Sequence, residues 1–334
     1  MGGRGGRLAL SVRRCDAGAL LVSAALLTSA APTANGPAQA RELRGVAAVD
    51  AALAVREVAP GVYVHFGQPL ALDAPGHDDI ANIGFIVGER CVAVIDTGGS
   101  TRIGRALRAA VRARSRLPIC YVINTHGHVD HVLGNSAFRP DGAQFVGHSQ
   151  LAAALNRSRR FLVQQYAGDL DQPPTPGQII EPGIKVQEDY DLDLGRRHLA
   201  LHAWPLAHSD CDLTMLDLKT GTLWAGDLLF RGRLPAVDGS VRGWLAALDE
   251  LARWRVRRTV PGHGPLTVRL AAALEPERGY LRALDSGVRA ALANGSSLQQ
   301  AIDQVGAEQA SRWSLWSVTH PRNVARVYQQ MQWQ

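Results

Sequence analysis

The sequence predicts an α/β sandwich of four layers, in which two β-sheets pack face to face and helices cover the outer faces. Short apolar runs rich in β-branched and aromatic residues alternate with longer stretches of helical periodicity. This alternation occurs in two similar halves, over residues 62–157 and residues 184–260. From residue 270 onward the chain is mostly helical, which indicates a helical extension after the sandwich.

The first 40 residues have the composition of a secretory signal peptide. Four Arg residues precede an apolar run over residues 17–31, and Ala-Gln-Ala at residues 38–40 supplies a cleavage site. We therefore expect export to the periplasm and a mature chain of one domain, residues 41–334. The pair Arg13-Arg14 leaves the twin-arginine route open, although the surrounding residues fit that signal poorly, which favours the Sec route.

The charge balance argues against a nucleic-acid-binding protein. The chain has a formal net charge of +6, and residues 1–40 contribute four Arg and one Asp, so the mature chain carries only +3. Its Arg residues are scattered along predicted helices and form no basic tract interleaved with aromatic residues. No second apolar stretch is long enough to cross a membrane, so we expect no membrane span after cleavage.

Three cysteines remain in the mature chain, namely Cys91, Cys120 and Cys211. An odd number in an exported protein argues against a disulfide framework. Cys91 and Cys120 lie in or beside predicted buried strands, so we interpret them as small core residues, with a bond between them left open. Cys211 is expected to line the candidate site without binding a metal.

The first half is expected to contain strands at residues 62–66, 82–87, 91–95, 119–124 and 144–146. Gly88 and Glu89 form a hairpin turn between two of them. Helices are expected at residues 101–115, after a cap at Ser100 or Thr101, and at residues 149–157.

The second half is expected to contain strands at residues 184–186, 190–194, 198–204, 213–218, 222–225 and 259–260. Helices are expected at residues 244–254, 270–293, 297–305 and 321–332. The core of the fold thus spans about residues 55–270, and residues 271–334 form a helical tail. Substrate specificity is assigned to three loops, at residues 69–79, 158–183 and 230–240.

The segment from His126 to His131 is the first candidate site. It contains three His and one Asp within six positions, in a chain that has only 11 His in total. Imidazole and carboxylate groups are ligands that zinc accepts. His126 and His128 follow the end of a predicted strand at a spacing of two, so they can point to the same side. Asp130 and His131, one turn later, can face a second centre nearby.

Three later polar residues, His208, Asp227 and His263, each lie where a predicted strand runs into a loop. Ligands gathered at strand ends are what a site at one edge of a sheet requires. Glycines at positions 226, 262 and 264 allow the backbone to turn sharply beside the last two.

These seven residues, in this order, resemble the metallo-β-lactamase-fold superfamily, whose motif is HxHxDH followed by single His, Asp and His ligands. The resemblance covers about residues 55–270 and implies an αβ/βα sandwich. It also implies that one metal binds His126, His128 and His208, that a second binds Asp130, His131 and His263, and that Asp227 bridges both.

The resemblance implies a hydrolase with two zinc ions that share a hydroxide and polarise the scissile group. Asp130 would be the catalytic residue, because it would orient the hydroxide and carry a proton to the leaving group. Zinc is the default metal, and iron or manganese fits the same ligands. The expected substrate is a small-molecule ester, thioester, lactone or amide.

A closer resemblance is to the quinoprotein relay system zinc metallohydrolases, carried by residues 81–88, 91–99, 224–230, 234–240 and 243–245. It implies a link to a periplasmic quinoprotein dehydrogenase or a c-type cytochrome system. Two alternatives stay open: a mononuclear iron dioxygenase of the same fold, and a metal-binding accessory protein without catalysis.

Several other polar residues receive weaker assignments. Asp78, Asp79, Arg231 and Arg233 flank strand ends and are considered for the rim of the pocket, where the two Arg residues would indicate an anionic substrate. The remaining histidines considered are assigned structural roles: His65, His77, His148, His198, His202 and His320.

Overall fold

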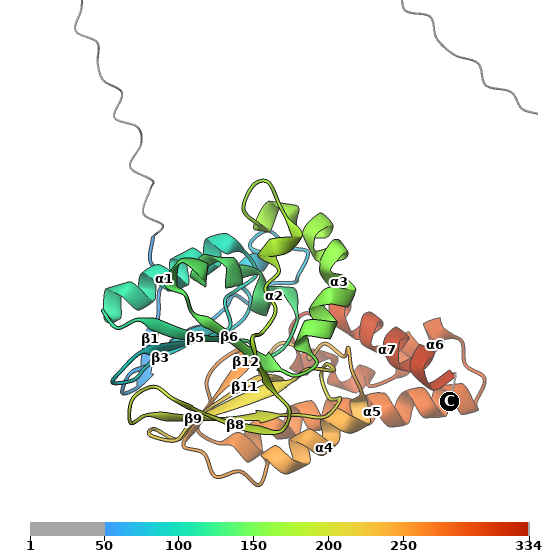
Figure 1. Cartoon of the computed structure of the whole chain (residues 1–334). Helices are drawn as coiled ribbons and strands as arrows, with labels where there is room; N and C mark the ends of the chain where they lie inside the picture. The colour runs from blue at the N-terminus through green and yellow to red at the C-terminus, as the bar shows by residue number, and fades with distance from the viewer. Residues whose placement is uncertain (1–50, 333–334) are drawn as a thin grey trace, which may run out of the picture. The chain divides into compact units, whose positions relative to one another are not determined.

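The computed structural model describes residues 51–332 (Figure 1). The expected signal peptide, residues 1–40, lies outside the described residues. Two β-sheets form the centre of the described part of the chain, one with seven strands and one with five. Among the described residues, we find no helix with the length and apolar character needed to cross a membrane.

The seven-stranded sheet is built from the first half of the chain, and its strands are neighbours in sequence order. They are β1 (Arg56–Ala59), β2 (Val62–His65), β3 (Ile83–Val87), β4 (Val92–Ile95), β5 (Ile119–Ile123), β6 (Gln144–His148) and β7 (Ile184–Val186). Strands β4 to β7 are parallel, and β1 to β4 are antiparallel.

The five-stranded sheet comes from the second half of the chain. In spatial order its strands are β12 (Arg258–His263), β11 (Thr222–Phe230), β10 (Leu213–Asp217), β9 (His198–Ala203) and β8 (Asp189–Asp193). Only β11 and β12 are parallel, and the remaining neighbours are antiparallel.

The α-helices and the short 3-10 helices connect successive strands along the chain or follow the last strand. The α-helices are α1 (Thr101–Arg114), α2 (Val129–Val132), α3 (Leu151–Gln165), α4 (Val241–Leu251), α5 (Leu270–Ala293), α6 (Leu298–Gln304) and α7 (Trp316–Gln332). The 3-10 helices are η1 (His77–Asp79), η2 (Leu133–Asp141), η3 (Ala167–Asp169), η4 (Pro176–Gln178) and η5 (Ala307–Arg312).

Side chains that alternate along β4 show how the layers are held together. Val92 and Val94 belong to the apolar cluster that packs the first sheet against α1. Ala93 and Ile95 point the other way and belong to the cluster between the two sheets. A further cluster packs the second sheet against α4, α5 and α7, around the buried Trp244. The order is therefore helix, sheet, sheet, helix (Figure 1), and the predicted sandwich with a helical C-terminal region is confirmed.

The strands β11 and β12 are longer than the sequence predicted. The predicted strand 222–225 ends before Gly226, but β11 continues to Phe230, and its pairing with β12 shifts register on both sides of Gly226. Gly226 has φ 53°, a conformation that glycine adopts without strain, so the strand turns there without ending. Asp227 therefore lies inside a strand, and His263 is the last residue of β12.

Two helices are also longer than expected. Helix α3 continues to Gln165, so the first part of the expected loop 158–183 is helical. Helix α7 begins at Trp316 and contains Pro321, which was predicted to be the first residue of the helix. A proline removes only one backbone donor, and the buried residues Asn323, Val324 and Val327 hold α7 against the molecule.

Cys91 and Cys120 form a disulfide, with their Cα atoms 5.8 Å apart. The bond that the sequence left open is therefore formed, and Cys91 is at the same time a buried core residue, as interpreted. They come together because β4 and β5 are neighbouring parallel strands, joined by the helix α1. Cys211 is buried and free.

Candidate metal centre

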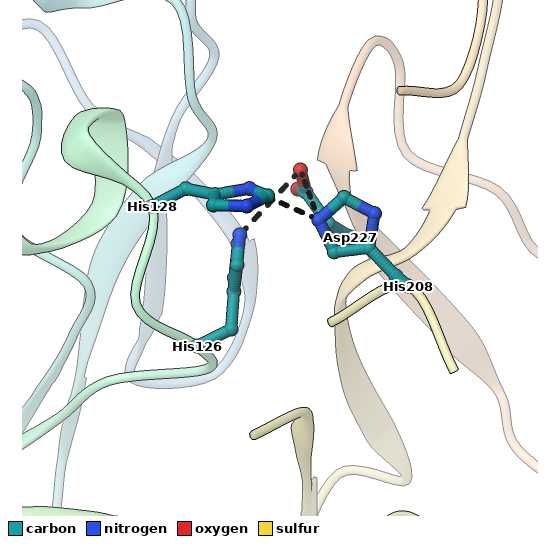
Figure 2. Close-up of side chains that lie close together, drawn as sticks. All are labelled: His126, His128, His208 and Asp227. Carbon is teal, nitrogen blue, oxygen red and sulfur yellow. Dashed lines mark hydrogen bonds and ion pairs between the residues drawn. The ribbon is translucent and has the colours of Figure 1, made fainter. Parts of the chain in front are cut away.

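The seven predicted ligands come from both halves of the chain and meet in one place. His126 and His128 lie between β5 and α2, and Asp130 and His131 lie within α2. His208 lies between β9 and β10, whereas Asp227 and His263 belong to β11 and β12. Figure 2 shows His126 and His128 pointing from one side toward His208 and Asp227 on the other. Long-range folding thus brings together residues up to 137 positions apart, from His126 to His263.

The side chains form two groups that are suited to metal binding. The first contains His126, His128, His208 and Asp227, and the second contains Asp130, His131 and His263. Within each group the ligand atoms lie within 4.8 Å of one another. The six other residues divide as the resemblance implied, and Asp227 falls in the first group. The assignment of these residues as metal ligands stays a prediction.

Asp227 lies at the centre of both groups. Its Oδ2 atom is 3.7 Å from His126 Nε2, 3.5 Å from His208 Nε2 and 3.4 Å from His263 Nε2. Its Oδ1 atom is 3.2 Å from His131 Nε2. Burial opposes ionisation of this carboxyl group, but the neighbouring His263, His131 and His126 outweigh that effect and hold its pKa well below the ordinary value. Asp227 is therefore an anion in the position expected of a bridging ligand.

Unpartnered polar atoms face the interior of the cluster. His126 Nε2, His131 Nε2 and Asp227 Oδ1 are buried and have no hydrogen-bond partner. Leaving such groups buried and unsatisfied costs on the order of 1–3 kcal/mol each. Imidazole nitrogen and carboxylate oxygen are donors that divalent transition metals prefer. Two such ions would satisfy these atoms, so the residues fit a dinuclear centre.

Each of the five histidines has its other ring nitrogen bound to an acceptor of the protein. The acceptors are Thr125 Oγ1 for His126 (3.1 Å), Asp238 Oδ2 for His128 (3.2 Å), Asp96 Oδ2 for His131 (2.8 Å), the Ala236 carbonyl for His208 (2.9 Å) and the Ile80 carbonyl for His263 (2.8 Å). Such outer bonds set the tautomer and the ring orientation of metal-binding histidines. His128 is the one imidazole of the five that presents Nδ1 to the cluster, at 3.1 Å from His208 Nε2.

Asp96 is a functional residue that the sequence did not single out, although it lies in the segment 91–99 that carries the closer resemblance. Its carboxylate accepts hydrogen bonds from His131 Nδ1, the Thr125 hydroxyl and the Thr125 backbone N–H. Asp96 has φ 51°, in the left-handed region that few residues other than glycine adopt. A buried strand that ends in an aspartate was the signal that could have identified it.

The loop between β11 and α4 contains two further contributors, Ala236 and Asp238, that the sequence did not reveal. The hydrogen bond from His128 lowers the pKa of Asp238 to about 2. Burial lowers the pKa of His208 to about 3. At neutral pH, Asp238 is thus an anion and His208 is uncharged, as a metal ligand must be.

A cavity of about 850 Å³ opens onto both groups. Its walls include Leu72, Leu162 and Val318 from three separate segments, together with Asp130 and Arg233. All three loops assigned to specificity contribute residues, since Leu72 lies in the first, Leu162 in the second and Arg233 in the third. The lining therefore combines apolar side chains with charged ones, which include Arg157, Asp210 and Arg326 in addition to Asp130 and Arg233.

The weaker assignments for the rim are only partly correct. Arg233 lines the cavity, but Arg231 donates to the Pro265 and Leu266 carbonyls and lies outside the cavity lining. Asp78 and Asp79 are also outside it, because Asp78 accepts from Ser100 and Asp79 binds His65. These contacts tie separate loops to each other, which short stretches of sequence do not reveal.

Cys211 lines the cavity and belongs to neither group of ligands. Burial raises the pKa of its thiol to about 12, so the thiolate that a metal requires is disfavoured. The other histidines lie outside both groups. His65, for example, binds the Ala54 carbonyl and Asp79, and His77 binds Asp169.

The fold and the two groups of ligands define a metal-dependent hydrolase. The family model of the metallo-beta-lactamase superfamily matches residues 77–263, more than half of the chain. The chain therefore belongs to the metallo-beta-lactamase superfamily. No curated protein matches the sequence.

Solved structures share the fold at low sequence identity. A metallo-beta-lactamase family protein from Thermus thermophilus has a TM-score of 0.58 and 19% identity, covering 83% of this chain and 95% of that one. A metallo-beta-lactamase from Pontibacter korlensis has a TM-score of 0.56 and 16% identity, covering 69% of this chain and 99% of that one. The sec-alkylsulfatase Pisa1 from Pseudomonas sp. has a TM-score of 0.61 and 16% identity, covering 83% of this chain and 50% of that one.

Proposed function

We propose that this chain is an exported hydrolase that uses two zinc ions to cleave an ester, thioester, lactone or amide bond in an anionic small molecule. One observation carries the proposal. The Asp227 carboxylate lies between 3.2 and 3.7 Å from the Nε2 atoms of four histidines that belong to two separate groups. A carboxylate in this position can bridge two cations.

Zinc bound at these residues would activate water at neutral pH and polarise the scissile carbonyl group. The protein supplies the proton transfer. Asp130 lines the cavity, and its Oδ2 atom is 3.4 Å from His263 Nε2. Burial opposes ionisation of Asp130, but His131 and His263 lower its pKa below the ordinary value. An ionised carboxylate at the edge of the cavity can accept a proton and then pass it to the leaving group.

The position of Arg233 supports the proposal that the substrate is anionic. Its guanidinium lies 3.2 Å from His263 Nδ1, but that nitrogen already donates to the Ile80 carbonyl and so offers no lone pair. Among residues 51–332, Arg233 has no carboxylate partner, whereas Arg157 and Arg326 in the same cavity are bound to Asp210 and Asp238. A free guanidinium presents a fork of donors that matches a carboxylate or a sulfate.

A substrate panel tests the proposed reaction. Zinc-loaded mature protein should hydrolyse at least one carbonyl substrate among esters, thioesters, lactones and amides, and His128→Ala should abolish that activity because one ligand is lost. Of two substrates that differ only in an anionic group, the one that carries this group should be hydrolysed faster. Arg233→Met should remove this preference, and Arg233→Lys should restore part of it. A protein with both zinc ions bound but no turnover on the panel would contradict the proposed reaction.

The proposed export is supported by the bond between Cys91 and Cys120, since disulfides persist in oxidising compartments. We further propose that the protein serves a periplasmic quinoprotein dehydrogenase or c-type cytochrome system, because residues 81–88, 91–99, 224–230, 234–240 and 243–245 resemble the quinoprotein relay system zinc metallohydrolases. Fractionation of expressing cells should place the protein in the periplasm, with its sequence beginning at Arg41. A cytoplasmic protein that keeps residues 1–40 would contradict the export.

A further inference from the structure

We infer that α7, the last helix of the described chain, positions the ligands of the first metal group and leaves the second group unaffected. The inference rests on the proposed two-metal centre. It concerns the clamp, which we define as the α7 residues Asn323, Arg326 and Gln330. These residues hold the loop of residues 234–240, and that loop orients two histidines of the first group.

Asn323 is the buried centre of the clamp. Its Oδ1 atom accepts from the Val237 backbone N–H at 2.9 Å, and its Nδ2 group donates to the Pro235 carbonyl at 2.7 Å. The second Nδ2 hydrogen is directed to the Tyr280 hydroxyl of α5 at 2.9 Å. The whole side-chain amide is therefore occupied, and it fixes the backbone on both sides of Ala236.

Two longer side chains extend the clamp along the same face of α7. Arg326 donates to the Asp238 carbonyl at 2.7 Å, and its Nη2 atom is 3.1 Å from Asp238 Oδ1. Gln330 donates to the Gly239 carbonyl at 3.1 Å. The spacings of three and then four residues place the three clamp side chains on one side of the helix. The clamp thus reaches the loop at successive points, from Pro235 to Gly239.

The clamped loop serves the first group of ligands. The Ala236 carbonyl accepts from His208 Nδ1, and Asp238 Oδ2 accepts from His128 Nε2. The loop is also bonded to the backbone next to the ligand, since Gly239 N–H donates to the His208 carbonyl at 2.7 Å. Displacement of the loop would therefore change the orientation of two of the three imidazoles in this group.

The second group of ligands is oriented by other parts of the fold. His131 is bound by Asp96, at the end of β4, and His263 is bound by the Ile80 carbonyl. Neither acceptor belongs to residues 234–240 or to α7. A general loss of stability would weaken both metals, whereas loss of the clamp should weaken only one. This asymmetry distinguishes a positioning role from a purely structural one.

The test is a competitive zinc titration of the mature protein with a chromophoric chelator. Asn323→Ala should lower the affinity of one of the two zinc ions roughly 10- to 100-fold and leave the other unchanged. Arg326→Ala, which changes an exposed side chain and should fold normally, should have a smaller effect on the same ion. Gln329→Ala, an exposed position of α7 outside the clamp, is the matched control and should resemble the wild type.

Equal losses for both zinc ions in Asn323→Ala and Arg326→Ala, or no loss in either variant, would overturn the inference. The titration of the wild type separates this result from failure of the proposed function. A wild-type protein that binds no zinc would overturn the proposed function, and that result is obtained before any variant is compared.

Discussion

Each histidine of the candidate centre turns one nitrogen inward and has the other held by the protein, so residues behind the ligands should control metal affinity. Asp96 is the clearest case, because its carboxylate orients His131 and binds Thr125 twice. Asp96→Asn should lower the affinity for zinc about 10- to 100-fold. Asparagine tolerates the left-handed φ of 51°, so the fold should be kept. An unchanged affinity in a zinc titration would contradict the role of Asp96.

Glu277 gives a prediction about pH. This carboxyl group in α5 is fully buried, and its Oε1 atom has no hydrogen-bond partner. Burial raises its pKa well above the ordinary value. The folded protein then keeps the proton while the unfolded chain loses it above about pH 4.3, so this residue lowers stability as pH rises from that value toward the folded pKa.

Glu277→Gln removes this titration and keeps the shape of the side chain. The variant should be more stable than the wild type at pH 8, with a difference that is smaller at pH 5. Urea unfolding of both proteins at the two pH values measures the effect, and comparing them cancels the shared pH dependence of metal binding. A difference in stability that is the same at both pH values would contradict the assignment.

At the scale of residues, the sequence predicted which seven side chains come together, because four of them lie within the six residues 126–131 and the other three were expected at strand ends. It did not reveal the acceptors behind them. Ala236 contributes only its backbone carbonyl, and Asp238 lies 110 positions from His128. Such contacts depend on tertiary packing and leave no local pattern.

At the scale of elements, Asp141 joins η2 to α1. Its side chain is only 2% exposed, and it accepts hydrogen bonds from Arg108 and Arg112. Burial opposes ionisation, but the two guanidinium groups lower the pKa of Asp141 below the ordinary value. The stabilisation is therefore present at neutral pH and is lost as pH falls below about 4, through the lowered pKa.

Asp141→Asn should reduce the free energy of unfolding by about 1–2 kcal/mol at pH 7, since the partly exposed Arg side chains are screened by solvent. The difference from the wild type should diminish in acid. Asp193→Asn, which alters an exposed ion pair with Arg90, is the control and should change stability little. Equal effects of the two substitutions in urea unfolding would contradict the role given to Asp141.

The boundaries of elements were harder to predict than their existence. Gly226 indicated the end of a strand, but the register shifts allow β11 to continue past it. Here glycine is also required by packing. A Cβ atom at Gly262 of β12 would lie 1.9 Å from Asp227 Oδ1, so no side chain fits beside the central carboxylate. These glycines allow the two strands to lie close together around the ligand. In the sequence, a glycine required by such packing looks the same as a glycine required by a turn.

For the whole molecule, the alternation of strands and helices was enough to predict the sandwich, because each sheet must bury both faces. Two features of the molecule could not be predicted from this alternation. The disulfide between Cys91 and Cys120 depends on which strands are neighbours. The shape of the cavity depends on segments as distant as Leu72 and Val318.

The central claim is that both halves of the fold contribute to one centre with two zinc ions. Metal analysis of freshly isolated mature protein tests it most directly. We expect about two zinc ions per chain in the wild type and a clear deficit in His128→Ala, which lacks one ligand of the first group. Protein that contains no bound transition metal would contradict the claim. About one iron per chain together with oxygen consumption would also contradict it and would indicate a dioxygenase.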